Sequence, residues 1–364
     1  MYDLSSFKGK KVVITGHTGF KGSWLSLWLI SLGADVYGIS LPPITSPSHF
    51  TTSELPAYIS SSYIDICDFS KLSKKIEEIQ PDYIFHLAAQ AIVRKSYADP
   101  LLTWGSNTFG TINLLESLRF LRKKCIAILI TSDKCYENVE WIWGYRENDK
   151  LGGSDPYSAS KAATEIAIRS YVDSYFNGVD CNIRIGIARA GNVIGGGDWS
   201  DDRIVPDAVR AWTTGKRLTL RSPASTRPWQ HVLEPLGGYL ILALALHASP
   251  KLNGEPFNFG PLGEEAKSVG RLIDEMSNYW GGSSLWDKSG DSGSLKEANL
   301  LRLNCDKASA LLSWTSVWNF HKTVQKTTLW YKNYYENQGR ATNNLSLSQI
   351  EEFTKDAKLL EIFA

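Results

Sequence analysis

Tyr157 and Lys161 stand four residues apart in a segment with helical spacing, and such a pair could transfer a proton. Residues at positions i and i+4 share one face of a helix, so the ammonium would lie near the phenol. A nearby positive charge lowers the pKa of a phenol from its usual value of about 10, which would make Tyr157 a base near neutral pH. Ser132 follows the apolar run 126–131 and could hydrogen-bond the same substrate hydroxyl. We therefore expect these three residues to form a triad for hydride transfer; the alternative is a solvated helix start that carries Tyr and Lys by chance.

Three glycines, Gly16, Gly19 and Gly22, follow the short apolar run 11–15 and open a segment with helical spacing. Gly16 would make a tight turn, Gly19 would let the backbone approach a diphosphate, and Gly22 would let helix and strand pack closely. Free N–H groups at the start of the helix would then face the phosphates. In this context the pattern predicts a dinucleotide site, with a simple glycine-rich turn as the alternative.

Residues after the other predicted strands would complete this site. The second predicted strand is followed by Ser40 and Leu41, with neither an acid to hold a ribose nor a cation to accept a 2′-phosphate. Asp65, after the third strand, could border an adenine. Small side chains at Ala88 and Ala89 would let the backbone pass close to the cofactor. The expected cofactor-binding residues are Gly16, Thr18, Gly19, Phe20, Gly22, Ser40, Asp65, Ile66, Leu87, Ala88, Ala89, Tyr157 and Lys161.

The elements that must position these residues alternate along the first half of the chain. Short apolar runs that predict buried strands lie at 11–15, 35–39, 82–86, 126–131 and 182–188, and a further strand ends at Ile64. Segments with helical spacing lie at 20–32, 69–80, 100–122 and 157–176. This alternation predicts an α/β fold, a doubly wound parallel sheet of the Rossmann type whose carboxyl edge binds ligands.

After about residue 191 the alternation loosens, and helical segments are predicted at 206–214, 233–247 and 269–279. We expect a dinucleotide-binding domain over 1–190, with later returns to its sheet. A smaller, interleaved substrate lobe would occupy mainly 191–340, followed by a C-terminal tail over 341–364. The Gly/Ser-rich stretch 281–293 predicts a flexible loop.

The composition excludes several classes of protein. Lys and Arg number 39 and Asp and Glu 38, a net charge of +1, which gives no electrostatic reason to expect binding to nucleic acid or membrane. The five cysteines are scattered without a CxxC pair, so we expect reduced thiols in a cytoplasmic protein and no metal site. No signal-peptide pattern opens the chain, and the apolar stretch 239–248 is too short to span a bilayer.

Six stretches together carry a family resemblance. They are 15–22 (TGHTGFKG), 87–90 (LAAQ), 131–136 (TSDKCY), 155–161 (DPYSASK), 189–199 (RAGNVIGGGDW) and 227–231 (RPWQH). The chain resembles extended short-chain dehydrogenases/reductases and, within them, nucleotide-sugar 4,6-dehydratases that act on CDP-glucose. The resemblance spans most of residues 10 to 235 and implies NAD as the cofactor.

The resemblance also implies a reaction in three steps. Tyr157 would remove the C4 hydroxyl proton while NAD⁺ takes the C4 hydride; water would then leave across C5 and C6, and the hydride would return to C6. Asp133 would be the acid for the C6 hydroxyl, which requires burial to raise its pKa. Lys134, where related dTDP-glucose and GDP-mannose enzymes have Glu, would be the C5 base only if desolvation or positive charge lowered its pKa. Alternatively, Lys134 pairs with Asp133 or a phosphate.

The expected partner is CDP-glucose or another nucleotide hexose, bound through its pyrophosphate. Arg suits phosphate because its fork binds two oxygens, although each candidate could be a surface ion-pair residue. The expected substrate-binding residues are Gln90, Asn107, Asn192, Arg203, Arg221 and Arg227, and Asn107 would bond main chain to shape the site. The aromatic run 140–147 could cover the active site or pack in the lobe.

Two rival functions remain open from the sequence. A nucleotide-sugar 4-epimerase or reductase would need the triad but no acid–base pair at 133–134, and a non-catalytic dinucleotide-binding protein would need no triad. The helices predicted at 100–122 and from Tyr157 resemble the dimer-forming helices of the superfamily, so we expect a homodimer or a larger even oligomer.

Overall fold

A computed structural model describes residues 1–178, 181–261, 267–282, 285–289, 300–339 and 342–364. Its centre is a seven-stranded sheet in the order β11-β6-β5-β4-β1-β2-β3, with every neighbouring pair parallel. The strands are β1 (Lys11–Thr15), β2 (Asp35–Ser40), β3 (Ser60–Tyr63), β4 (Tyr83–His86), β5 (Cys125–Ile130), β6 (Ile183–Ala190) and β11 (Pro256–Phe259). The predicted doubly wound sheet is confirmed, and its order reverses between β1 and β4, where such folds bind ligands.

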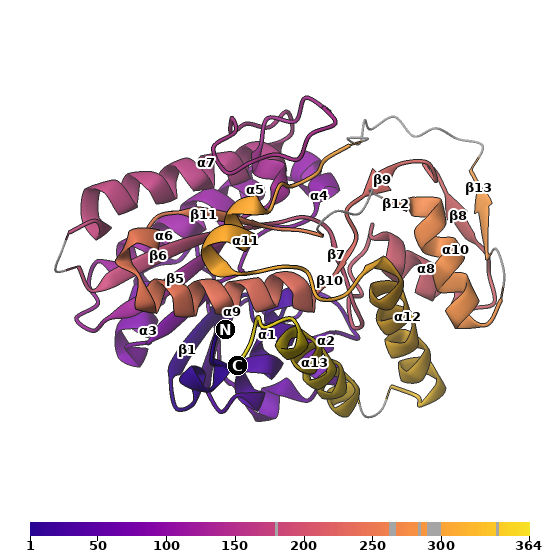
Figure 1. Ribbon diagram of the computed structural model, residues 1–364, viewed down its shortest axis with the longest axis horizontal. Coiled ribbons are helices and arrows are strands. Elements are labelled where there is room, and N and C mark those ends of the chain that lie inside the picture. Colours follow the sequence, from indigo (N-terminus) through magenta and orange to yellow (C-terminus); the bar gives the residue numbers. More distant parts are fainter. Residues whose placement is uncertain (179–180, 262–266, 283–284, 290–299, 340–341) are drawn as a thin grey trace.

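Helices cover both faces of this sheet, as Figure 1 shows. Alternate residues of one strand face opposite sides: Val12 and Ile14 of β1 pack in one core and Val13 in the other. The first core includes α1 (Phe20–Ser31), α9 (Leu233–Ala248) and α13 (Thr342–Leu359). The second includes α3 (Phe69–Ile79), α6 (Gly110–Leu118) and α7 (Pro156–Tyr171). Burial on both faces explains why the central strands β1, β4 and β5 are nearly continuous apolar runs, whereas the edge strand β3 is polar and partly exposed.

Two predicted helices contain a widened turn. The helix predicted at 100–122 consists of α5 (Pro100–Trp104), a π-helical segment (Gly105–Phe109) and α6, and it ends at Leu118. It ends earlier than predicted, and Leu121, beyond its end, packs in the second core. The helix predicted at 157–176 is α7 followed by a second π-helical segment (Val172–Phe176).

The remaining elements gather mostly at one end of the molecule (Figure 1). The helices there and elsewhere are α2 (His49–Thr52), α4 (Val93–Ala98), α8 (Ile204–Thr213), α10 (Val269–Trp280), α11 (Asp306–Leu312) and α12 (Phe320–Glu336). Short 3₁₀ turns occupy Leu4–Phe7, Leu55–Ala57, Asp133–Cys135 and Pro250–Leu252. Two-residue to three-residue strands form the pairs β7 (Val193–Ile194) with β10 (Gln230–His231), β9 (Thr226–Arg227) with β12 (Lys267–Ser268), and β8 (Leu218–Leu220) with β13 (Trp286–Lys288).

Strand β13 lies within the stretch 281–293, for which the sequence predicted a loop. It forms because its backbone pairs in parallel with β8, a long-range contact that composition cannot reveal. Residues 283–284 and 290–293 of that stretch lie outside the described residues. No described helix combines the length and apolar character needed to cross a membrane.

The C-terminal segment packs against the beginning of the chain. Phe353 of α13 and Phe363 both contact the Trp28 ring of α1 edge-on, with centroids 5.7 and 6.1 Å away. His49 of α2 hydrogen-bonds Ser346 of α13 at 3.0 Å. These contacts close the sheet face on the α1 side.

Candidate active site

The glycine-rich turn at the carboxyl end of β1 places no side chains between its backbone and a ligand. Gly16 has φ +75°, and a Cβ there would lie 2.7 Å from the Ala88 nitrogen, so only glycine fits between the turn and the end of β4. A Cβ on Gly22 would lie 2.1 Å from the Gly16 carbonyl oxygen, which shows how closely α1 packs on the turn. Gly19 is the N-cap of α1 and supplies no side-chain cap, so the helix N-terminus can accept an anion.

The other candidate cofactor residues border this turn. Thr18 and Ser40 share a hydrogen bond of 2.8 Å between their hydroxyls, and Thr18 also donates to the Leu41 carbonyl at 2.9 Å. These bonds join the turn to the end of β2. Beyond β3, Asp65 accepts a hydrogen bond from the Cys67 amide, and Ile66 packs beside Gly110 of α6.

The triad lies at the adjoining ends of β5 and α7. Asp155 caps α7 through the Ser158 amide and Pro156 occupies its first turn, which fixes where Tyr157 enters the site. Ser132, Tyr157 and Lys161 are all buried, and the Lys161 amine donates to the Ile130 carbonyl at 3.4 Å.

The pKa of Tyr157 differs from the expectation that a neighbouring ammonium lowers it. Burial raises the pKa of Tyr157 to about 12, and a hydrogen bond with Ser132 and the charge of Arg203 only partly oppose that rise. Burial also lowers the pKa of Lys161 to about 8, with Glu165 acting in the opposite direction. The expectation was wrong because it counted the charge and omitted the desolvation of both groups.

Asp133 is the buried carboxyl beside the triad. It accepts a hydrogen bond of 2.9 Å from the Ser132 hydroxyl, and a Cβ on Gly191 would lie 3.1 Å from its Oδ2. Burial raises the pKa of Asp133 above its ordinary value, opposed by Lys134, the Ser132 hydrogen bond and Lys21. The Lys134 side chain is partly exposed, and its backbone amide donates to the Ser132 hydroxyl. Burial is therefore the largest influence on the Asp133 carboxyl, and it favours the protonated form.

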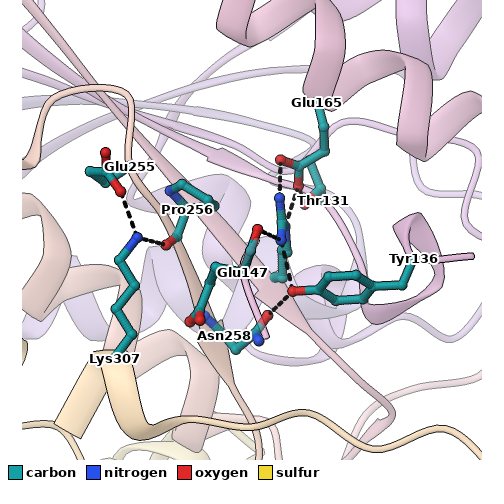
Figure 2. Close-up of polar contacts among 9 residues, drawn as sticks. Thr131, Tyr136, Glu147, Glu165, Glu255, Pro256, Asn258 and Lys307 are labelled. Carbon is teal, nitrogen blue, oxygen red and sulfur yellow. Dashed lines mark hydrogen bonds and ion pairs between the residues drawn. The ribbon is translucent and has the colours of Figure 1, made fainter. Parts of the chain in front are cut away.

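A buried polar network joins the residue after β5 to α7 and β6. Arg189 of β6 binds both carboxylate oxygens of Glu165 at 2.9 and 2.8 Å, and Thr131 donates to the same carboxylate. Figure 2 shows Glu165 and Thr131 on one side of this network and Tyr136, Glu147 and Asn258 on the other. Glu165 lies one helical turn after Lys161 and Thr131 directly precedes Ser132, so the network fixes both backbones of the triad.

The sequence analysis gave no role to this ion pair. Two residues in the sequence could have pointed to the pair: Glu165, a charged residue on the helix of Tyr157, and Arg189, at the end of an apolar strand. Neither signal identifies its partner, because the pairing depends on the order of β5 and β6 in the sheet.

The candidate substrate residues surround the triad unevenly. Asn107 accepts from the Gln90 amide at 2.8 Å and donates to the Gln90 carbonyl at 3.1 Å, so it holds the loop after β4. Arg203 forms an ion pair of 3.1 Å with Asp198 and is close enough to lower the pKa of Tyr157.

The other three candidates are placed by their neighbours in the chain. Asn192 follows Gly191, which packs against Asp133, and Arg227 precedes Pro228, which packs against Gly191. Arg221 is exposed at the end of β8. Among the candidate arginines, Arg203 acts on the triad through its charge, which opposes the rise in the pKa of Tyr157.

Lys21 and Tyr239 lie beside the candidate residues, and neither was predicted from the sequence. The Lys21 amine lies 3.4 Å from the Tyr239 hydroxyl, and its charge interacts with those of Arg203, Asp133 and Lys161. The signal was present in the turn TGHTGFKG, where a lysine stands between Phe20 and Gly22. Tyr239 lies in a strongly apolar helix, where nothing in the pattern separates it from core residues.

Comparison with known proteins agrees with this geometry. A family model described as GDP-mannose 4,6 dehydratase matches residues 13–327. CDP-glucose 4,6-dehydratase of Salmonella typhimurium is 44% identical over 335 residues, which cover 91% of this chain and 93% of that protein.

Solved structures share the fold at lower identity. DesIV, a dTDP-glucose 4,6-dehydratase from Streptomyces venezuelae crystallised with NAD, superposes with a TM-score of 0.76 at 22% identity, covering 90% of this chain and 98% of that one. A UDP-glucuronic acid 4-epimerase from Bacillus cereus, crystallised with NAD, gives 0.75 at 23% identity, covering 89% and 100%. The fold alone therefore does not separate dehydratase from epimerase, but the family match extends over most of the sequence. The sequence-based assignment is confirmed: this chain belongs to the GDP-mannose 4,6-dehydratase family of nucleotide-sugar enzymes.

Proposed function

We propose that the chain converts CDP-glucose to CDP-4-keto-6-deoxyglucose, with NAD as a cofactor that is regenerated in each turnover. The observation that carries this proposal is the buried Asp133 carboxyl, hydrogen-bonded to Ser132 of the triad, with its pKa raised by burial. Oxidation alone does not need such an acid, whereas loss of a hydroxyl as water does. The 44% identity to a CDP-glucose 4,6-dehydratase supports the choice of nucleotide.

The residues around the turn fit a dinucleotide. Gly16 and Gly22 keep the cradle free of side chains, and the N-terminus of α1 has no side-chain cap to compete with a diphosphate. The nucleoside would be lined by Thr18, Ser40, Asp65 and the chain at 87–89. The residues that end β2 and follow it, Ser40 and Leu41, carry no positive charge that would bind a 2′-phosphate, so NAD fits better than its phosphorylated form. NAD held there would supply the hydride acceptor for oxidation at C4 and the hydride for reduction at C6.

The triad performs the proton transfer of the first step. Tyr157 takes the C4 hydroxyl proton, and Ser132 hydrogen-bonds the same oxygen. Because burial holds the pKa of Tyr157 at about 12, the phenolate needs positive charge nearby, and Arg203 supplies part of it. Lys161 stays beside β5 through its bond to the Ile130 carbonyl.

Asp133 performs the acid step of the elimination. It gives its proton to the C6 hydroxyl, which leaves as water, while a base takes the C5 proton and the C5–H electron pair forms the C5–C6 double bond; Lys134 is the candidate base from the sequence. When hydride reaches C6, the same base returns the proton to C5. Tyr157 has gained a proton and Asp133 has lost one, so exchange with solvent restores both before the next turnover.

Incubation with NAD⁺ and, separately, CDP-, dTDP-, GDP- and UDP-linked hexoses tests this proposal by mass spectrometry. We expect loss of one water from CDP-glucose, and Tyr157→Phe should abolish turnover while its circular dichroism stays unchanged. An unchanged mass accompanied by altered sugar stereochemistry would instead establish a 4-epimerase. Full activity of Tyr157→Phe would refute the assignment of the base.

We also propose a cytoplasmic homodimer, or a larger even oligomer, that makes a deoxysugar for a surface polysaccharide. The exposed apolar side chains of Leu101, Phe109 and Ile166, which are 83%, 61% and 62% exposed, support an interface along α5, the following π-helical segment and α7. Light scattering at micromolar concentration should find a dimer or tetramer, and a monomer alone would refute the interface.

A further inference from the structure

A buried histidine, His49, lies where three helices meet. It is the first residue of α2, is 1% exposed and stacks on the Trp24 ring of α1 with centroids 4.7 Å apart. Its Nδ1 lies 2.9 Å from the Ser23 hydroxyl of α1, and its Nε2 lies 3.0 Å from the Ser346 hydroxyl of α13 and 3.2 Å from that of Ser53. One imidazole therefore joins the helix that follows the glycine turn to the C-terminal helix.

The neighbours of His49 fix the direction of these hydrogen bonds. Burial lowers the pKa of His49 to about 3, so the ring is neutral, with one nitrogen that donates and one that accepts. The Ser23 hydroxyl donates to the Phe20 carbonyl at 2.9 Å, so Nδ1 of His49 is the donor to Ser23. At the other nitrogen, the Trp330 indole of α12 donates to the Ser346 hydroxyl at 2.9 Å, and that hydroxyl donates its own hydrogen to Nε2. The bonds thus run in one direction, from the Trp330 indole to the Phe20 carbonyl, and in a buried site each bond of such a chain strengthens the next.

This chain of hydrogen bonds ends on the first turn of α1. Phe20 is the first residue of that helix and follows Gly19, the N-cap that supplies no side-chain hydrogen bond. The N–H groups of this turn are the ones that would face a diphosphate. Ser23 stands three residues after Phe20, so its bond to the Phe20 carbonyl spans the turn. A shift of Ser23 therefore moves the groups that would bind phosphate.

The three consecutive glycines at 195–197 pack against rings of the same network. A Cβ on each of them would lie 3.2, 2.0 and 2.7 Å, in that order, from Phe20, Trp330 and His49. Because no side chain fits in these places, the backbone of this glycine loop lies directly on the network. The loop continues to Arg203, so the network joins the candidate cofactor helix to a candidate substrate residue.

We propose that His49 is a positioning residue for the cofactor site, which holds the first turn of α1 against the glycine loop; this role rests on the dinucleotide site proposed at the glycine turn. His49 acts on that site through Ser23 and touches no reacting atom. The C-terminal helix takes part through Ser346, although 297 residues separate it from His49 along the chain. The last segment of the chain therefore helps to set the affinity of the site that the first segment builds.

Calorimetry with NAD⁺ as the probe compares wild type with His49→Phe, Ser346→Ala and Ser348→Ala. His49→Phe keeps a ring on Trp24 and removes both nitrogens, whereas Ser346→Ala removes only the hydroxyl on the distant helix. We expect each of these two variants to bind NAD⁺ about fivefold or more weakly than wild type. Ser348→Ala is the matched control on the same helix, because its exposed hydroxyl donates only to the Leu345 carbonyl among the described residues. Its affinity for NAD⁺ should equal that of wild type.

Urea unfolding of the same variants separates positioning from stability, because a lost buried hydrogen bond lowers the midpoint whatever its role. The double variant His49→Phe/Ser23→Ala should bind NAD⁺ no more weakly than His49→Phe alone, since both changes break one chain of bonds. If Ser346→Ala unfolds at lower urea yet binds NAD⁺ within about 1.5-fold of wild type, the network serves stability alone and the positioning role is refuted. If His49→Phe does not fold, Ser346→Ala and Ser23→Ala decide. If wild type itself does not bind NAD⁺, the proposed dinucleotide site fails together with this role, whereas normal binding in the variants refutes the role alone.

Discussion

Replacing Arg189 by methionine is expected to destabilise the protein by about 3–5 kcal/mol, because it leaves the Glu165 carboxylate buried without its partner. Both side chains are 3% exposed, and two hydrogen bonds of 2.8 and 2.9 Å join them. Arg189 also donates to the Tyr136 hydroxyl at 2.7 Å and to the Glu147 carbonyl at 2.9 Å. One substitution therefore leaves several buried acceptors unpaired.

The magnitude follows from which groups remain after each substitution. Desolvation of two ions offsets much of their attraction, so removing both charges costs far less than removing one. The double variant Arg189→Met/Glu165→Met should be more stable than Arg189→Met alone. Arg217→Met is the control at the surface: its Nε bonds both carboxylate oxygens of Asp287, the two side chains are 49% and 61% exposed, and such pairs contribute about 0–1 kcal/mol.

Urea unfolding followed by circular dichroism measures these differences. We expect a large fall in the midpoint for Arg189→Met, partial recovery in the double variant and almost no change for Arg217→Met. A loss below about 1 kcal/mol for Arg189→Met, or a double variant less stable than either single one, would refute the reasoning.

Three further predictions concern the acid, the glycine turn and the C-terminal helix. Because burial raises the pKa of Asp133 above its ordinary 3.8, the folded state binds a proton there that the unfolded state has released. The free energy of unfolding of the wild type should therefore fall as pH rises from about 4 through that raised pKa. Asp133→Asn should lose this pH dependence and should no longer eliminate water, while it still oxidises C4. If the pH dependence of unfolding is the same in Asp133→Asn and wild type, the carboxyl does not hold a proton in the folded state. Gly22→Ala places a Cβ 2.1 Å from the Gly16 carbonyl, so calorimetry should find NAD⁺ binding weakened by more than about tenfold, and wild-type affinity would show that α1 need not pack so closely. Phe353→Ala should cost about 3–5 kcal/mol in urea unfolding, because this buried ring contacts Trp28 and Trp318; a cost below about 1 kcal/mol would mean that the tail contributes little.

The sheet could be predicted from the sequence because its strands are buried on both faces. The run 126–131 is almost wholly apolar, and every residue of β5 is buried. The turn at Gly16 was predictable for a related reason: its positive φ and its contact with Ala88 admit no side chain. Local chemistry of this kind leaves a clear trace in a single sequence.

Features that depend on long-range packing could not be predicted. Lys21 and Asp133 are far apart in the chain, and their charges interact because β4 alone separates β1 from β5. The contact of Phe353 with Trp28 joins the two ends of the chain. The pKa of Tyr157 was mispredicted for the same reason, because burial, which depends on the whole fold, outweighs the neighbouring charges.

The most direct test of the dehydration uses CDP-glucose labelled with deuterium at C4, incubated with the protein and NAD⁺. Mass spectrometry and NMR then locate the label in the product. The account predicts a product lighter by one water that carries the deuterium on its C6 methyl group. A product of unchanged composition with the deuterium still at C4 would contradict it and would place the chain among the epimerases.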